Sequence, residues 1–177
     1  MNPAAENLVE SRPNEPIRIP TSADEPKTLV DLFSRVALKH KRPDTLNYKK
    51  DGQWVAISSD ELLTRAERIA VGLYSIGVKK GDRLALLSET RVEWTLTDAG
   101  CVFSGIIDVP IYPTQTPPQV RYILNDSGAC VLVIEDRRKF DELAEVLKDC
   151  SQVRKIVVFD PEGMDHADVI TLSELEE

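Results

Sequence analysis

From residue 28 onward, the hydrophobic positions of the chain switch repeatedly between helical and extended spacing. Apolar residues recur every three or four positions in segments that predict amphipathic helices over residues 29–40, 58–76, 117–127 and 137–148. Between them, short apolar runs predict strands over residues 83–87, 106–109, 129–134 and 155–159. These runs do not alternate with polar residues, so helices should cover both faces of the predicted sheet.

The segment 81–114 contains two of these strands with a further helix between them. Thr90 is predicted to cap this helix over residues 91–104, Gly105 to end it, and Pro110 to end the strand that follows. A strand, a helix and a strand this close together favour a right-handed crossover, because an antiparallel hairpin needs no helix in between. The sequence therefore predicts an α/β fold with a Rossmann-like parallel sheet and helices on both faces.

Three local signals before this unit predict an N-terminal helix and a small β-hairpin. Thr28 should cap the first helix. The dipeptide Asp51-Gly52 between two short extended runs is a hairpin signal, and it predicts strands over residues 45–49 and 53–57. Ser58 and Glu61 have the spacing of a capping box, which should open the longest helix.

The two ends of the chain differ in character from its middle. Residues 1–27 hold five of the 11 prolines and few large apolar residues, which predicts a flexible leader. We expect residues 28–177 to form one subdomain that is incomplete at its C-terminus. Within it, the segment after Asp160 is predicted to be a loop until a helix begins at Leu172, where the sequence looks like an interrupted element.

Composition and charge narrow the class of protein. With 42% hydrophobic and 29% charged residues, the 177-residue chain is typical of a globular protein, and no apolar run approaches membrane-spanning length. The net charge is −8, and residues 135–177 carry 13 acidic against 6 basic residues. Nucleic acid is excluded as a partner, because no basic face with interleaved aromatic residues is present. Three widely spaced cysteines, Cys101, Cys130 and Cys150, favour reduced thiols in a cytoplasmic protein over a zinc site or disulfide framework.

Three segments carry a resemblance to a known family. They are GDRLALLSETRVEW at residues 81–94, GIIDVPIYPT at residues 105–114 and YILNDSGACVLVIED at residues 122–136. Together they resemble the N-terminal part of the AMP-forming acyl-CoA synthetases, within the superfamily of adenylate-forming enzymes. The form Tyr112-Pro113-Thr114 is most similar to the long-chain fatty acid branch. The resemblance covers roughly residues 28–160.

The resemblance implies an activity for the parent enzyme rather than for this chain alone. Such an enzyme uses ATP and Mg²⁺ to convert a fatty acid to an acyl-adenylate and diphosphate, and then passes the acyl group to CoA. Its phosphates are held by a Ser/Thr/Gly-rich loop followed by a lysine, and the eight glycines of this sequence form no such cluster. We therefore expect the chain to be a catalytically silent fragment, with no catalytic or metal-binding residues, no bound co-substrate, and the rest of its adenylating domain as partner.

One basic cluster is a candidate site. Arg137, Arg138 and Lys139 open the helix after the third core strand, where positive side chains and free backbone N–H groups both favour a phosphate. The resemblance implies that CoA phosphates lie near this helix start, and that Tyr112 and Thr114 lie beside the CoA path. The alternative is a solvated helix face, with Arg137 paired to Asp141 and Arg138 to Glu142.

Other residues that could carry chemistry have simpler explanations. Glu89 and Glu93 could form paired carboxylates, but a helix start also favours acidic groups. Trp94 could line an acyl pocket, but aromatic residues of amphipathic helices usually pack in the core. His40 lies at a predicted helix end among lysines and His166 in an acidic loop far along the chain, so no Ser/His/Asp set can be argued. Gly100 and Gly105 have the end spacing of a P-loop without its lysine, so close helix packing and a helix stop explain them better.

Two alternatives to this hypothesis stay open from the sequence. The chain could be a complete non-catalytic α/β module that binds a partner or a nucleotide, or a fragment of a ligase for an aryl or short-chain acid. A severed subdomain should expose apolar surface, so it should bind hydrophobic dyes or self-associate. For the intact enzyme, peripheral attachment to a membrane is a further alternative to a purely cytoplasmic location.

Overall fold

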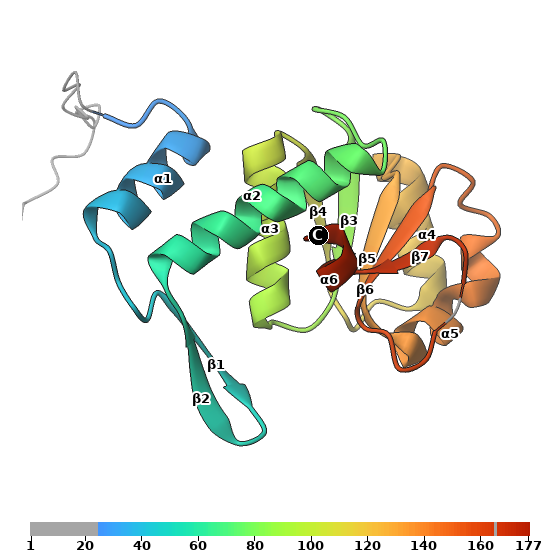
Figure 1. The fold of residues 1–177 in the computed structure, drawn as a ribbon. Coiled ribbons are helices and arrows are strands. Elements are labelled where there is room, and N and C mark those ends of the chain that lie inside the picture. The colour runs from blue at the N-terminus through green and yellow to red at the C-terminus, as the bar shows by residue number, and fades with distance from the viewer. Residues whose placement is uncertain (1–24, 165) are drawn as a thin grey trace, which may run out of the picture.

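A five-stranded parallel sheet forms the centre of the computed structural model, which describes residues 25–164 and 166–177 (Figure 1). The strands lie in the order β4 (Ile107–Ile111), β3 (Arg83–Leu87), β5 (Val131–Asp136), β6 (Lys155–Asp160) and β7 (Val169–Thr171). Every neighbouring pair is parallel. The α/β fold that the sequence predicts is therefore confirmed.

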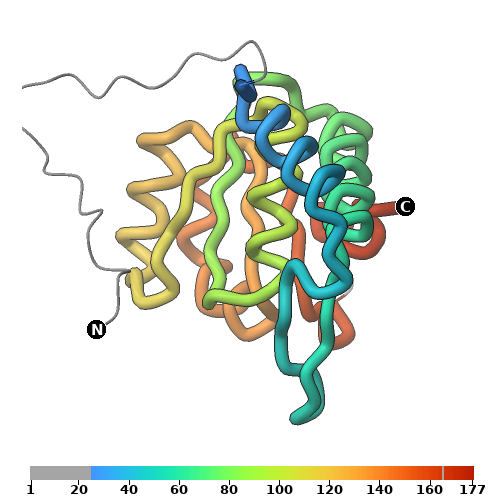
Figure 2. Tube along the Cα trace, turned by 90° about the vertical axis from the view of Figure 1, so that its left-hand side faces the viewer, coloured from blue at the N-terminus to red at the C-terminus, as the bar shows by residue number. Residues whose placement is uncertain are grey.

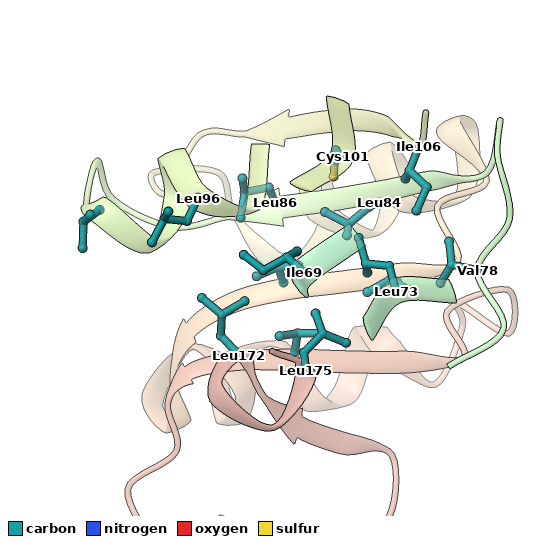
Figure 3. Packing of buried hydrophobic residues seen from close by; sticks show 14 of the residues in the cluster. Ile69, Leu73, Val78, Leu84, Leu86, Leu96, Cys101, Ile106, Leu172 and Leu175 are labelled. Atoms are coloured by element: carbon teal, nitrogen blue, oxygen red, sulfur yellow. The ribbon is translucent and has the colours of Figure 1, made fainter. Parts of the chain in front are cut away.

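Helices cover both faces of the sheet, as expected from its continuously apolar strands. One face packs against α2 (Ser59–Ser75), α3 (Val92–Ser104) and the short α6 (Leu172–Leu175), and the other against α4 (Pro117–Ser127) and α5 (Arg137–Leu147). Successive strand residues alternate between these two cores. Figure 3 shows the first core, in which side chains from three elements meet: Ile69 and Leu73 of α2, Leu84 and Leu86 of β3, and Leu172 and Leu175 of α6.

Two glycines allow the helices of the first face to approach closely. A methyl group on Gly100 of α3 would overlap the side chain of Ile69 on α2, so the interpretation of Gly100 as a packing glycine is confirmed. A methyl group on Gly72 of α2 would overlap the backbone carbonyl of Leu175 on α6. These positions explain why α2 lies directly against its two neighbours.

The N-terminal helix and the hairpin also agree with the sequence predictions. Helix α1 (Leu29–Lys39) begins after Thr28, whose hydroxyl accepts the backbone N–H of Asp31 at 3.0 Å. Strands β1 (Leu46–Lys50) and β2 (Gln53–Ile57) pair in antiparallel fashion around Asp51 and Gly52, which both have positive φ. Figure 2 shows α1 running beside the helical layer and the hairpin projecting beyond it. Residues 1–24 of the predicted leader lie outside the described residues.

Several boundary predictions are wrong. Helix α3 begins at Val92 with Arg91 at its N-cap, so Thr90 does not cap it. Strand β4 continues through Pro110 to Ile111, because β4 is an edge strand, where a missing N–H is tolerated. Strand β5 begins at Val131 and continues to Asp136, two residues beyond the predicted end. Strand β7 lies within the segment predicted to be a loop, while α6 begins at Leu172 as predicted.

The remaining structural expectations concern the cysteines, the aromatic residues and membrane spans. The three cysteines are unpaired and buried, and Trp94 packs against the first core. None of the helices within the described residues combines the length and the apolar character that a membrane span requires.

Candidate functional site

The order of the sheet reverses between β3 and β5, and the carboxyl ends of these strands open into a cleft. From β3 the chain passes through α3 to β4 on one side, and then returns through α4 to β5 on the other. Open α/β sheets bind ligands at such a switch point, beyond the carboxyl ends of the strands. The cleft has a volume of about 720 Å³, and it is lined by Leu46, Asn47, Tyr48, Lys49, Lys50, Glu89, Thr90, Arg91, Val92, Glu93, Thr95, Glu135 and Asp160.

Arg91, which lines this cleft, links the start of α3 to the ends of β5 and β6. Its guanidinium lies 2.6 Å from Glu93, 2.7 Å from Asp160 and 3.5 Å from Glu135, and it stacks over the ring of Phe159. Burial lowers the pKa of Arg91, but the hydrogen bonds to Glu93 and Asp160 more than offset this, so the pKa is raised. The carboxylates around Arg91 are therefore partly neutralised by one cation held from three sides.

The explanation of Glu93 by a helix start, which the sequence favours over paired carboxylates of Glu89 and Glu93, is confirmed. Glu93 lies in the first turn of α3, where the helix dipole favours a carboxylate, and its partner is Arg91. Glu89 precedes the helix, so the two residues are not one helical turn apart. Its backbone N–H instead points to Glu135 at 3.5 Å.

At the other candidate site, the start of α5, the three basic residues have different environments. Arg137 and Arg138 are exposed, whereas Lys139 is buried. Arg137 pairs with Asp141 at 3.4 Å, as the solvated-face alternative predicts. Arg138 does not pair with Glu142 but with Asp136, at 3.8 Å.

The loop after β4 lies against this helix start. Its turn is closed by the backbone N–H of Gln115, which donates to the carbonyl oxygen of Tyr112 at 3.0 Å. The ammonium of Lys139 lies 3.4 Å from the carbonyl oxygen of Pro113 and 2.8 Å from Glu142. Tyr112 is 76% exposed, and Thr114 is also exposed. The structure thus brings together the two segments in which the sequence places candidate residues.

Comparison with known proteins identifies the family. The sequence model of the family described as "AMP-binding enzyme" matches residues 33–176. The chain belongs to this family. A long-chain-fatty-acid–CoA ligase of Mycobacterium bovis is 32% identical over 145 residues, which cover 80% of this chain and 24% of the relative.

Solved structures of ligases share the fold. The crystal structure of coronafacic acid ligase from Pectobacterium brasiliense is 26% identical with a TM-score of 0.68, covering 81% of this chain and 28% of that one. A putative long-chain-fatty-acid CoA ligase from Rhodopseudomonas palustris is 27% identical with a TM-score of 0.69, covering 84% and 36%. The chain spans about a quarter of the length of the curated relatives it matches.

Within this member of the AMP-binding family, the sequence did not reveal how Lys139 or Arg91 acts. Lys139 lies four residues before Leu143, so both residues are on the buried side of α5. This helical spacing from an apolar residue is the sequence signal that could have predicted a buried lysine. Besides the nearby Glu93, the partners of Arg91 are Glu135 at the end of β5 and Asp160 at the end of β6, which no local pattern connects to Arg91. His40 ends α1, while the ring of His166 packs against Phe140 of α5. Across residues 25–164 and 166–177, no group of three or more His, Cys, Asp or Glu side chains is arranged to hold a metal ion.

Proposed function

We propose that this chain is the N-terminal part of the adenylating domain of a long-chain fatty acid–CoA ligase, with residues 28–177 forming one subdomain. The parent would convert fatty acid, ATP and CoA to acyl-CoA, AMP and diphosphate. The observation that carries this proposal is the family match over residues 33–176, together with relatives that bear this name over 80% or more of the chain. A cytoplasmic location belongs to the same proposal and is supported by three unpaired cysteines.

In this proposal, ATP and Mg²⁺ bind mainly to the remainder of the parent protein. The 177-residue sequence contains no Ser/Thr/Gly-rich loop with a following lysine that could hold the phosphates. The described residues also supply no carboxylate cluster for the metal. No step of adenylation is therefore assigned to residues of this chain, and the chain alone should be inactive.

A second candidate is a ligase for a different carboxylic acid. The observation that favours this second candidate is the similarity to coronafacic acid ligase, at 26% identity over 81% of this chain. The two candidates differ in acid specificity but share the family and the fold. They are separated only by the choice of acid in an assay.

The test is an activity measurement on the product of the complete reading frame that encodes these 177 residues. Release of AMP would be followed with palmitate, benzoate and acetate, in the presence and absence of CoA. We expect CoA-dependent AMP release that is fastest with palmitate. Faster release with benzoate or acetate would overturn the long-chain assignment, and no release with any acid would favour the non-catalytic module.

The CoA site within this proposal consists of Arg137 and Arg138 on α5 together with Tyr112 and Thr114 on the neighbouring turn. Support comes from exposure: all four side chains are accessible, and the two arginines are only loosely paired with Asp141 and Asp136. Lys139 is assigned no contact with CoA, because its ammonium is buried and already bonded.

Replacing Arg137 and Arg138 by Ala in the intact enzyme should raise the Michaelis constant for CoA about tenfold. Loss of one charge-assisted hydrogen bond costs about 1.5 kcal/mol, which corresponds to roughly that factor. The constant for fatty acid should not change. Arg121→Ala is the control, because Arg121 on α4 forms a similar exposed pair with Asp149, which follows α5. An unchanged CoA constant in the double variant would remove these residues from the site.

A further inference from the structure

Lys139 is an unusual residue, because it is a lysine that is only 7% exposed. Lysine is almost never fully buried unless it is paired, since removing its charge from water is costly. Its two neighbours in the basic cluster, Arg137 and Arg138, have side chains that are 52% and 71% exposed. The cluster that looks uniform in the sequence therefore contains one buried cation and two accessible ones.

The contacts of Lys139 join two elements. Its ammonium lies 2.8 Å from the Glu142 carboxylate on the same helix and 3.4 Å from the backbone carbonyl oxygen of Pro113, 26 residues away in sequence. Its backbone N–H donates to the side chain of Asp136 at 2.8 Å, which fixes the first turn of α5. Because Glu142 neutralises the ammonium, the side chain can act as a tether without adding net charge at the surface.

The turn that receives this tether is also fixed at its other end. Gln115 closes it by a hydrogen bond to Tyr112, and Thr116 then starts α4 with a capping box that includes Gln119. The contact with Lys139 is made at Pro113, in the middle of the turn. The internal bonds of the turn fix its own shape, whereas the contact of Lys139 with Pro113 joins the turn to α5.

We propose that Lys139 is a positioning residue that holds the Tyr112–Gln115 turn against the start of α5. In this arrangement Tyr112 and Thr114 on the turn and Arg137 and Arg138 on the helix form one surface for the phosphate groups of CoA. The role of Lys139 in CoA binding rests on the proposed function. The contact between Lys139 and the turn does not depend on that function. A prearranged surface binds an anionic substrate more tightly, because less ordering is required on binding.

The tether can be tested in the 177-residue chain by hydrogen exchange. Lys139→Met keeps the length of the side chain but removes its charge and donors. Loss of the tether should accelerate exchange of the Gln115 N–H by roughly fivefold or more, as expected when about one hydrogen bond is lost. Exchange in α3, which packs on the opposite face of the sheet from α5, should not change. Lys139→Arg, which retains the charge and the donors, should restore slow exchange.

Lys148→Met is the matched control, because Lys148 forms the same kind of pair with Glu145 at 2.8 Å on the exposed end of α5. It should leave Gln115 unaffected. If Lys139→Met does not fold, Lys139→Gln replaces it, since glutamine is polar but too short to bridge to Pro113, and the same acceleration is expected. Unchanged exchange at Gln115 in the folded Lys139 variant would overturn the tether.

The positioning role is tested in the product of the complete reading frame. Lys139→Met should raise the Michaelis constant for CoA at least fivefold and leave both kcat at saturating CoA and the constant for fatty acid unchanged. Faster exchange combined with an unchanged CoA constant would overturn the positioning role. If the unmodified enzyme forms no acyl-CoA, the proposed function fails instead, and the exchange measurement still decides whether Lys139 is a tether.

Discussion

Asp108 on β4 is the residue whose replacement should stabilise the protein. Its Oδ1 atom is buried without a hydrogen-bond partner among the described residues. Burial and the nearby charge of Asp98 raise the pKa of Asp108 to about 6, while a hydrogen bond from the backbone of Val109 lowers it in part. Burial raises the pKa of Asp98 as well, and burial together with the charges of Asp108 and Asp98 raises the pKa of the Cys101 thiol. Asn at position 108 would remove the unfavourable charge.

The magnitude follows from the difference between the folded and the ordinary pKa of Asp108. A rise of the pKa from 3.8 to about 6 means that the ionised carboxylate destabilises the folded state by at most about 3 kcal/mol. Because Asp108 is only partly buried, solvent screening reduces this to about 1–2 kcal/mol. The folded state binds the proton more tightly, so the contribution of Asp108 is favourable below about pH 4 and is lost as the pH rises through 6. Asp108→Asn should therefore change little at low pH and stabilise the protein near pH 8.

Urea unfolding at about pH 4 and about pH 8 measures this effect directly. We expect Asp108→Asn to increase the free energy of unfolding by about 1–2 kcal/mol at the higher pH only. Glu67→Gln is the control, because it removes the same charge from an exposed site in the middle of α2. A variant that is equally stable or less stable than the original protein at the higher pH would refute the reasoning.

Two further predictions concern packing and ion pairs. Gly72→Ala should lower the free energy of unfolding by about 1–2 kcal/mol, because its methyl group would overlap the carbonyl of Leu175, and it should speed hydrogen exchange in α6. Val71→Ala, at the exposed neighbouring position, should change neither the free energy of unfolding nor the hydrogen exchange of α6. Equal exchange rates of α6 in the two variants would contradict the packing argument. Arg91→Met should destabilise the protein by about 2 kcal/mol in urea, because three carboxylates lose their shared cation. Arg42→Met, at an exposed pair, should cost less than about 1 kcal/mol, and equal losses would refute the special role of Arg91.

Local signals explain why most of the fold could be predicted. The caps at Thr28 and Ser58, the turn at Asp51-Gly52 and the helix stop at Gly105 each depend on neighbouring residues alone, and each occurs in the structure. The parallel sheet followed from how closely its strands and helices succeed one another. These features are encoded over a few residues, so no tertiary information was required.

The errors arise where tertiary contacts decide. Strand β7 has only three residues, and its pairing with β6 determines that it is a strand. Pro110 stays within β4 because that strand lies at the edge of the sheet. Arg91 takes the N-cap position while its side chain reaches carboxylates on β5 and β6. None of these relations can be derived from residue spacing.

The candidate CoA site shows the same division. The sequence singled out Arg137 to Lys139 as a group, because charge and helix position are local properties. It could not separate the buried Lys139 from its exposed neighbours, nor place Pro113 beside it, because that contact joins segments 26 residues apart. The assignment of these residues to CoA stays a prediction.

The central claim is that the chain belongs to a larger ligase of the AMP-binding family, and the coding sequence beyond Glu177 tests it most directly. We expect the reading frame to continue within a few tens of codons into a Ser/Thr/Gly-rich loop that ends in lysine, which would supply the phosphate site. A stop codon directly after Glu177 would contradict the claim. The chain would then be a stand-alone module of the AMP-binding family, and the search would turn to its binding partner.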